Sequence, residues 1–294
     1  MDLQANSAFE TDQASPEILA ELGNAHLRQG RFAEAEQAYL AALAGEGNCA
    51  AAHNGLADMR LPGEDYQEIL KRLHDWLKPA GYVEIGVCHG ESLRLAQAPT
   101  RAVGVDPAPR LLHRLSATAT IFQETSDAFF AARPLSEALG GASLDMAFID
   151  GLHTFEQALA DFINLERWAH PRSVFLIHDC WPLDEPTQTR ERLTAFWTGD
   201  VWRVMPMLKA RRPDLTMFTI KARPSGLGVV TNLDPSSTVL RDRYMDILGD
   251  GLTLSFAELE AKRDEMLCPQ DNDWDAIQAR LVSAWDSRGL SRRS

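Results

Sequence analysis

The sequence predicts an α/β protein with a doubly wound, mostly parallel seven-stranded sheet, preceded by a helical hairpin and followed by a helical tail. Three observations predict this fold. Short apolar runs alternate with stretches of helical periodicity, as expected for parallel strands that are covered on both faces. Two further apolar runs follow close together, and a glycine-rich turn comes directly after the first run. The five alternating runs are YVEIGV (82–87), RAVGVD (101–106), ATIF (119–122), LDMAFID (144–150) and SVFLIHD (173–179).

The composition is that of an acidic globular chain of 294 residues. Its hydrophobic share of 45% is ordinary for a protein with a buried core. There is no run of about 18 apolar residues, so we expect no membrane span. The polar N-terminus lacks the features of a signal peptide, which favours the cytoplasm. The formal net charge of −13 disfavours a nucleic-acid partner, because such proteins normally present a basic surface. A small-molecule acceptor is favoured instead.

The N-terminal part is predicted to comprise a disordered tail (1–16) and tetratricopeptide-like helices (17–61). Two apolar stripes flank a turn at 29–31, and Leu56 follows Leu22 at the 34-residue period of that repeat. Fewer than two repeats are visible. Two interpretations therefore stay open: a platform for a homo-oligomer or a protein partner, or a helical cap packed on the main domain.

Residues 62–234 are predicted to form the main domain. A helix from Asp65 to Leu77 precedes the five parallel strands, and the runs 215–222 and 226–233 resemble a terminal antiparallel pair. Residues 235–294 are predicted to be a helical extension whose packing is anchored by Trp274 and Trp285. In a doubly wound sheet, ligands bind outside the carboxyl ends of the strands, so the site is expected there.

The turn after the first strand reads EIGVCHGES, from Glu84 to Ser92. Gly86 and Gly90 allow the backbone to approach a ligand closely, and a helix is expected to begin near Ser92. Asp106 ends the second strand, where a carboxylate can accept hydrogen bonds from a ribose diol. The spacing G-x-x-x-G departs from the dinucleotide fingerprint. Glu84 would repel a phosphate but suits a cofactor with a sulfonium and an amino group, which favours S-adenosyl-L-methionine (SAM) over NAD.

Four motifs together resemble a class I SAM-dependent methyltransferase of methyltransferase family 24: EIGVCHGES, GVDP, FIDGLHTFEQALADF and LIHDC. The resemblance covers roughly residues 66–233. That family is similar to metal-dependent O-methyltransferases acting on sugars and other natural products. The cofactor residues that it implies are Glu84, Gly86, Gly90 and Ser92 around the methionine part, Asp106 at the ribose, Ser126 and Asp127 near the adenine, and Asp150.

Four ionisable side chains are expected in the middle of the carboxyl edge, where the fourth and fifth strands end as neighbours: Asp150, His153, His178 and Asp179. Charges in such a place are costly unless they are paired, protonated or bound to a metal. The resemblance implies that Asp150 and Asp179 hold a divalent metal, usually magnesium. His178 stands where related enzymes usually carry a carboxylate. As a third ligand it offers nitrogen, which shifts the preference towards manganese, iron or zinc.

The catalytic candidates are His153 as the base, with Asp150 and His178 beside it. Three alternatives stay open. His153 or His178 acts as a base without a metal. Iron held by both histidines and a carboxylate makes the protein an oxidase or hydroxylase on the same fold. The third alternative is a non-catalytic module that binds SAM and docks a partner.

The segment after the fifth strand is expected to shape the acceptor pocket. TRERLTAFW (189–197) is predicted to be helical. Trp181 and Trp202 either stack on an acceptor ring or pack in the core. Lys209, Arg211 and Arg212 are candidates to hold an acidic group of the acceptor. The predicted function is therefore a SAM-dependent, metal-assisted O-methyltransferase acting on a hydroxylated small molecule such as a sugar or another natural product.

Overall fold

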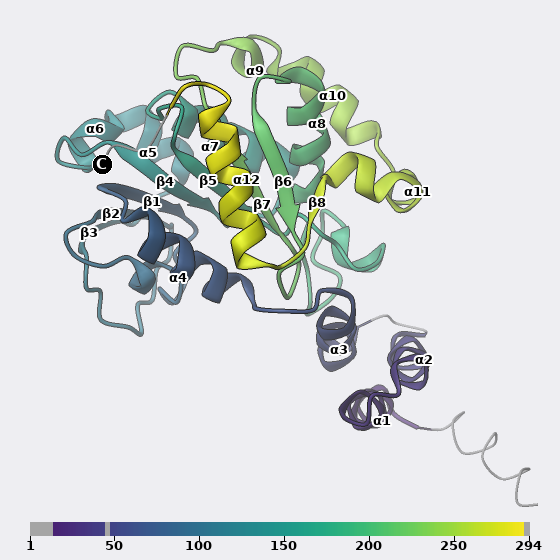
Figure 1. Ribbon diagram of the computed structural model, residues 1–294. Helices are drawn as coiled ribbons and strands as arrows, with labels where there is room; N and C mark the ends of the chain where they lie inside the picture. The colour runs from purple at the N-terminus through teal and green to yellow at the C-terminus, as the bar shows by residue number, and fades with distance from the viewer. Residues whose placement is uncertain (1–13, 45–47, 291–294) are drawn as a thin grey trace, which may run out of the picture.

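The centre of the computed structural model, which describes residues 14–44 and 48–290, is one eight-stranded sheet (Figure 1). The strand order is β3-β2-β1-β4-β5-β7-β6-β8. Strand β7 runs antiparallel to its neighbours β5 and β6, and the other pairs are parallel. The predicted doubly wound, mostly parallel fold is thus confirmed. The strands are β1 (Gly81–Ile85), β2 (Arg101–Val105), β3 (Thr118–Phe122), β4 (Leu144–Ile149), β5 (Val174–His178), β6 (Thr216–Ile220), β7 (Leu227–Thr231) and β8 (Pro269–Gln270).

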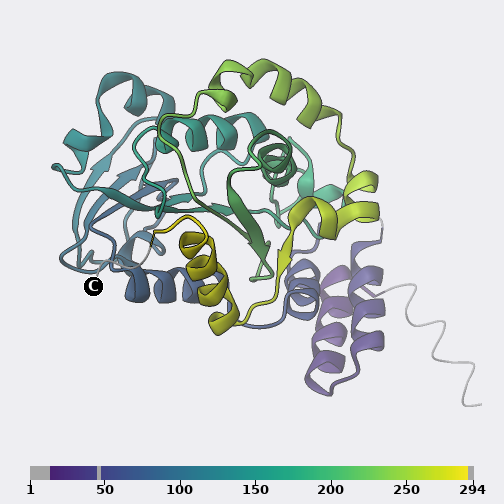
Figure 2. The same cartoon turned by 45° about the horizontal axis from the view of Figure 1, so that its top comes forward.

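Helices cover both faces of the sheet (Figure 2). One face carries α4 (Tyr66–Leu77) and α12 (Trp274–Asp286), and there Trp76 stacks on Trp285 with ring centroids 5.6 Å apart. All residues of β1 and β5 are buried, because both faces of these strands are covered. The helices of the other face are α5 (Ser126–Ala132), α6 (Leu135–Ala138), α7 (Phe155–Glu166), α8 (Val204–Arg211), α9 (Val239–Asp242), α10 (Tyr244–Thr253) and α11 (Phe256–Leu267).

Three local predictions differ from the structure. The helix expected near Ser92 is only a three-residue 3-10 helix, η2 (Leu93–Leu95). The segment 189–197 is irregular and lies between the 3-10 helices η3 (Pro186–Gln188) and η4 (Val201–Arg203). Its side chains are engaged in tertiary contacts, such as the hydrogen bond from Trp197 Nε1 to the Thr189 carbonyl, which outweigh helix propensity. The sheet has eight strands rather than the predicted seven, because the two-residue β8 is too short to show a strand pattern in the sequence.

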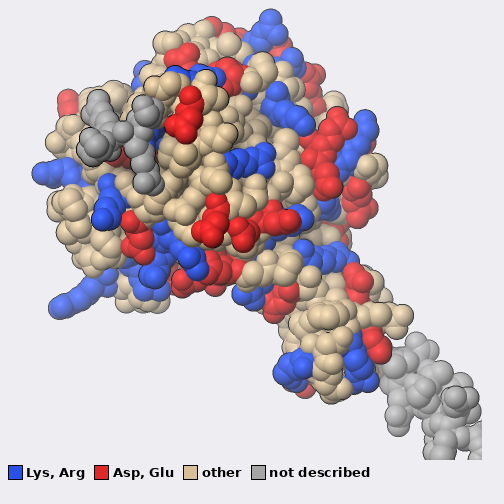
Figure 3. Space-filling model, viewed as in Figure 1, with Lys and Arg blue, Asp and Glu red and all other residues tan. Residues whose placement is uncertain are grey.

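The N-terminal helices α1 (Pro16–Arg28), α2 (Phe32–Leu43) and α3 (Ala50–Arg60) form a unit that projects from the main body (Figures 1 and 3). Tyr39 of α2 packs against Gly23 and Gly55, where a Cβ atom would lie 2.5 and 2.2 Å from its ring. Its hydroxyl donates to Asn24 Oδ1 at 2.7 Å. Glycine is therefore required at both contacts. The tetratricopeptide likeness of this unit stays a prediction, and the predicted tail lies almost wholly outside the described residues.

The charges on the face shown in Figure 3 do not favour a partner of one sign. On the face shown in Figure 3, acidic and basic side chains are interspersed over the body and over the N-terminal unit. No helix in the described part of the chain is long and apolar enough to cross a bilayer.

Candidate active site

A cavity of about 300 Å³ lies at the carboxyl ends of β1 to β4. It occupies the position at which doubly wound sheets bind their ligands. We call it the cofactor cavity. Its lining residues are Ile85, Gly86, Val105, Asp106, Pro107, Thr125, Ser126, Asp127, Gly151, Leu152, Gln157 and Asp161.

The turn after β1 brings the backbone close to this cavity. Gly86 has φ +88°, and a Cβ atom there would lie 1.9 Å from the Asp150 carbonyl oxygen, so only glycine fits. Asp106 Oδ2 accepts hydrogen bonds from the amides of Val87 and Cys88 at 2.9 and 2.8 Å. The acid at the end of β2 therefore holds the turn as well as facing the cavity.

The predicted cofactor residues divide into two groups. Gly86, Asp106, Ser126 and Asp127 line the cofactor cavity, whereas Glu84, Gly90, Ser92 and Asp150 are not among its lining residues. The side chain of Glu84 is fully buried on β1 and accepts hydrogen bonds from Tyr82 Oη at 2.6 Å and Ser92 Oγ at 2.8 Å. Glu84 and Ser92 thus bind one another in the interior.

Two further polar residues of the cofactor cavity did not emerge from the sequence. Gln157 and Asp161 of α7 both line it, and Gln157 Nε2 donates to Asp161 Oδ1 at 3.2 Å. Burial raises the pKa of Asp161 to about 6, against the lowering effect of its hydrogen-bond donors. The signal in the sequence is an acid at position i+4 from Gln157 on the apolar face of a helix.

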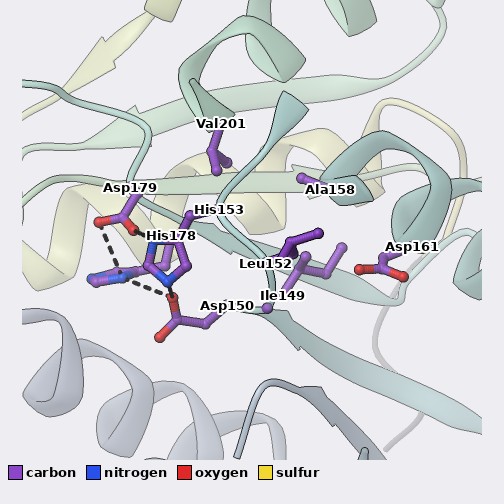
Figure 4. A pocket seen from close by; sticks show the side chains of 10 residues that line it. Ile149, Asp150, Leu152, His153, Ala158, Asp161, His178, Asp179 and Val201 are labelled. Atoms are coloured by element: carbon purple, nitrogen blue, oxygen red, sulfur yellow. Dashed lines mark hydrogen bonds and ion pairs between the residues drawn. The ribbon is translucent and has the colours of Figure 1, made fainter. Parts of the chain in front are cut away.

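The four predicted reaction-centre residues do converge (Figure 4). His153 Nδ1 lies 2.6 Å from Asp179 Oδ2, and its Nε2 lies 3.6 Å from Asp150 Oδ1. His178 Nδ1 lies 3.2 Å from Asp150 Oδ1 and 3.3 Å from Asp179 Oδ1. Each histidine thus lies between the same two carboxylates.

The charges of this cluster balance one another. Burial lowers the pKa of His178, but the carboxylates of Asp179 and Asp150 outweigh that effect and raise it to about 9. The pKa of His153 is also raised, because its contact with Asp179 outweighs burial. Burial alone would raise the pKa of Asp150, yet His178 holds it below its ordinary value. Two imidazolium groups can therefore neutralise two carboxylates in the absence of any ion.

The backbone at the cluster adopts an uncommon conformation. His153 and Asp179 have φ values of +59° and +60°, in the left-handed region that non-glycine residues seldom adopt. Gly199 packs directly on this backbone, since a Cβ atom there would lie 1.7 Å from the His153 carbonyl oxygen. Backbone strain of this kind persists only where surrounding contacts enforce it, and it gathers at functional sites.

A second cavity, of about 190 Å³, opens on the other side of the cluster. We call it the acceptor cavity. It is lined by Asp150, His153, His178, Asp179, Phe196, Trp197, Thr198, Pro224 and Ser225. Trp197 stacks on His153, with ring centroids 5.2 Å apart and planes inclined by 18°. The aromatic wall comes from the segment that was predicted to be helical.

The aromatic and basic residues proposed for acceptor binding lie elsewhere. Trp202 is fully buried in the core, and Trp181 packs beneath Arg263. The three basic candidates are engaged by protein groups: Lys209 donates to the Glu265 carbonyl, Arg211 pairs with Asp250, and Arg212 pairs with Glu166 and Asp214. None of these five residues is among those lining the acceptor cavity. The aromatic residues that line this cavity are Phe196 and Trp197 of the same segment after β5.

The cluster also offers a possible set of metal ligands. One ligand atom each of Asp150, His153 and Asp179 lies within 4.8 Å of the others. This set includes His153, whereas the sequence had suggested His178 as the third ligand. Two carboxylates and one imidazole suit manganese, iron or zinc as well as magnesium.

The family comparison agrees with this arrangement. Residues 83–180, about a third of the chain, match a family model described as a methyltransferase domain. The segment contains the glycine turn, Asp106 and the whole reaction-centre cluster. The predicted resemblance to a methyltransferase domain is confirmed over residues 83–180, which form the part of the doubly wound sheet that carries the cluster.

Solved structures with a similar fold are distant. The O-methyltransferase from Bacillus cereus in complex with SAH is 14% identical, with 60% of this chain and 86% of that chain covered and a TM-score of 0.43. The O-methyltransferase TomG from Streptomyces achromogenes, in complex with SAM, is 16% identical, with 57% and 79% covered and a TM-score of 0.41. No curated protein matches the sequence.

Proposed function

We propose that the protein is a SAM-dependent O-methyltransferase that acts on a hydroxylated small molecule, assisted by a divalent metal. One observation carries the proposal: the two cavities meet at the loop that follows β4. Gly151 and Leu152 of this loop line the cofactor cavity, and Asp150 and His153 line the acceptor cavity. Methyl transfer needs the donor and acceptor atoms face to face, and this loop is where two ligands would meet.

The cofactor cavity suits a cation with several hydrogen-bond donors. Asp106, Asp127 and Asp161 contribute three carboxyl groups to its wall. SAM carries a sulfonium, an ammonium, a ribose diol and an amino group on its adenine, all of which pair with carboxylates. Leu152 at the junction is 64% exposed, an apolar surface that a bound cofactor would cover. SAM would supply the methyl group.

His153 is placed to take up the proton of the acceptor hydroxyl. Asp179 Oδ2 lies 2.6 Å from Nδ1 of His153 and orients the ring. Nε2 is then the nitrogen that can accept a proton from the acceptor. Trp197 stacks on the same ring and limits its rotation. The raised pKa of His153 means that the ring must first lose a proton before it can act as a base. His178, buried and in contact with both carboxylates, fixes the positions of Asp150 and Asp179.

A divalent ion held by Asp150, His153 and Asp179 would lower the pKa of a bound hydroxyl. With such an ion His153 would serve as a ligand, and without it His153 would serve as the base. The donor set fits such an ion, although the two histidines already neutralise the acids. The oxidase alternative would need iron held by both histidines and one carboxylate, whereas the ligand atoms that lie within 4.8 Å of one another come from one histidine and two carboxylates.

Binding measurements on the purified protein test this function first. We expect S-adenosyl-L-homocysteine (SAH) to bind in about the micromolar range by calorimetry, and Mn²⁺ to bind the cluster by electron paramagnetic resonance. Absence of SAH binding in Mn²⁺-replete protein overturns the methyltransferase assignment. Turnover that survives a chelator unchanged overturns the role of the metal.

An acceptor screen with catechols and methyl glycosides follows, with SAH release as the readout. His153→Ala should abolish turnover and leave SAH binding intact, because His153 is not among the residues lining the cofactor cavity. His113→Ala is the matched control, since His113 is an exposed histidine that forms, among the described residues, only a long ion-pair contact with Glu91, 4.0 Å away. Full activity of the His153 variant would remove the proposed base.

A further inference from the structure

The N-terminal helices contact the segment that forms one wall of the acceptor cavity. We call residues 183–198 the wall segment. Leu183, at its start, is buried in the same apolar cluster as residues of α1, α2 and α3, and Phe196, near its end, packs against that cluster. Phe196 also lines the acceptor cavity. One side chain therefore belongs to both the N-terminal unit's core and the reaction site.

His53 of α3 lies at the centre of this contact. It is fully buried, and its Nε2 lies 2.9 Å from Asp184 Oδ2. Its ring stacks on Phe196, with centroids 5.3 Å apart and planes inclined by 26°. His53 thus joins both ends of the wall segment to one helix.

Two hydrogen bonds to the backbone reinforce the contact. The amide of Ala195 donates to Asn48 Oδ1 at 2.8 Å, and Arg60 Nη1 donates to the Leu183 carbonyl at 3.3 Å. Backbone groups of a loop are usually satisfied by water, so side-chain partners from a distant part of the chain restrict its conformation.

Two successive hydrogen bonds link Asp184 to Thr198, which is next to Trp197 in the chain. Asp184 Oδ1 accepts from the Thr187 amide at 3.0 Å, and the Thr187 carbonyl accepts from the Thr198 amide at 2.9 Å. Thr198 lines the acceptor cavity, and the preceding residue is Trp197, which stacks on His153.

A second segment that lines the acceptor cavity, next to Arg223, is bound to α3 as well. Arg223 Nη1 donates to Asp58 Oδ1 of α3 at 2.6 Å, and its Nη2 donates to the Gly63 carbonyl at 3.0 Å. The next two residues, Pro224 and Ser225, line the acceptor cavity. Helix α3 therefore contacts two separate segments whose residues line the acceptor cavity.

We propose that His53 is a positioning residue of the acceptor site and that helices α1–α3 form the outer support of the acceptor pocket, so that acceptor affinity depends on them. The effect on acceptor affinity rests on the proposed function, whereas the positioning of Trp197 by His53 does not depend on it. The N-terminal unit thereby acts within the catalytic domain's own site, whether or not it also docks a partner.

Fluorine NMR of protein labelled with 5-fluorotryptophan tests the placement without any ligand. The Trp197 signal is assigned by its loss in Trp197→Phe. His53→Ala and Asp184→Asn should each shift or broaden that signal. Tyr39→Phe is the control, because it removes a hydrogen bond inside the N-terminal unit that does not involve the wall segment. An unchanged Trp197 signal in folded His53→Ala or Asp184→Asn protein overturns the proposal.

Kinetics with the best acceptor of the screen tests the consequence. We expect His53→Ala to raise the acceptor KM about tenfold and to change kcat less than about twofold, the pattern of lost ground-state binding. SAH affinity should stay unchanged, because no residue of the wall segment lines the cofactor cavity. An unchanged KM overturns the role in acceptor affinity. If the wild type itself fails to bind SAH, the proposed function fails, while the fluorine measurement still decides the placement.

Discussion

Replacing Glu84 with glutamine separates two roles of this side chain, contact with the cofactor and burial in the sheet. Burial raises the pKa of Glu84 from 4.5 to about 8, and the charge of Asp150 adds to this, against the lowering effect of the Tyr82 and Ser92 hydroxyls. The folded protein therefore keeps this carboxyl protonated at a pH where the unfolded chain has released the proton. Glutamine has a similar shape and is neutral at every pH. Its carbonyl oxygen can accept one of the two hydrogen bonds, and its amide group can donate to the oxygen of the other hydroxyl.

The sign and size of the effect follow from proton linkage. Below its ordinary pKa of 4.5 the group is protonated in both states and makes no difference to stability. As the pH rises towards the folded pKa, the free energy of unfolding of the wild type falls by about 1.4 kcal/mol per pH unit. Between about pH 5 and about pH 7 the loss is about 2.5 kcal/mol by the same relation. Glu84→Gln should gain stability over the wild type by that margin across the interval.

Urea unfolding followed by circular dichroism, repeated across this pH interval, measures the margin. A margin that does not grow with pH would refute the reasoning. Asp214→Asn is the control of opposite kind. The hydrogen bond and charge of Arg212 hold the pKa of Asp214 below 3.8, and an arginine keeps its charge over the whole interval. The stabilising contribution of Asp214 is complete well above its pKa, so the loss in the variant should be constant over the interval.

The affinity of the Glu84→Gln variant for SAH tests whether Glu84 contacts the cofactor. If Glu84 held the ammonium group of the cofactor, its neutralisation would weaken binding about tenfold or more, since charge-assisted hydrogen bonds contribute about 1.5–3 kcal/mol. We expect less than a twofold change, because Glu84 is not among the residues that line the cofactor cavity.

Three further substitutions probe the site. Asp106→Asn should weaken SAH binding about tenfold or more by calorimetry, since the amide loses a charge that faces the cavity; unchanged affinity would exclude Asp106 from cofactor binding. Asp200→Ala should lower the urea-unfolding free energy by about 1–3 kcal/mol, because it removes the buried oxygen that accepts from the Phe155 amide at the start of α7; a change below about 0.5 kcal/mol would contradict its capping role. Gly199→Ala should abolish SAH release in the acceptor assay, because its Cβ would lie 1.7 Å from the His153 carbonyl oxygen. Normal turnover would show that activity does not require the left-handed backbone conformation of His153.

Hydrophobic pattern alone was sufficient for the sheet. The runs that became β1, β2, β4 and β5 are mostly apolar because both faces of these strands are covered, and such runs stand out from the flanking amphipathic helices. The reaction centre was equally accessible to prediction. Asp150 and Asp179 directly follow neighbouring parallel strands, so the topology of the sheet places them together.

The side chains that line the pockets could not be predicted in the same way. The segment 189–197 has a helical pattern, yet it is irregular because its side chains and backbone contact Asn48, α3, α7 and one another. Trp197, rather than Trp181 or Trp202, consequently faces the reaction centre. Such contacts join residues far apart in the chain, and no local period records them.

The chain order of residues by itself determined that this protein has a doubly wound sheet, a glycine turn with an acid after the next strand, and two acids and two histidines at its carboxyl edge. Only the tertiary structure decided which of these groups face a cavity. Glu84 lies next to the glycine turn in sequence but points into the interior, because alternate residues of a strand face opposite sides of the sheet. His53 is distant in sequence but supports the acceptor wall, because burial of the N-terminal helices against residues 183–196 brings it there.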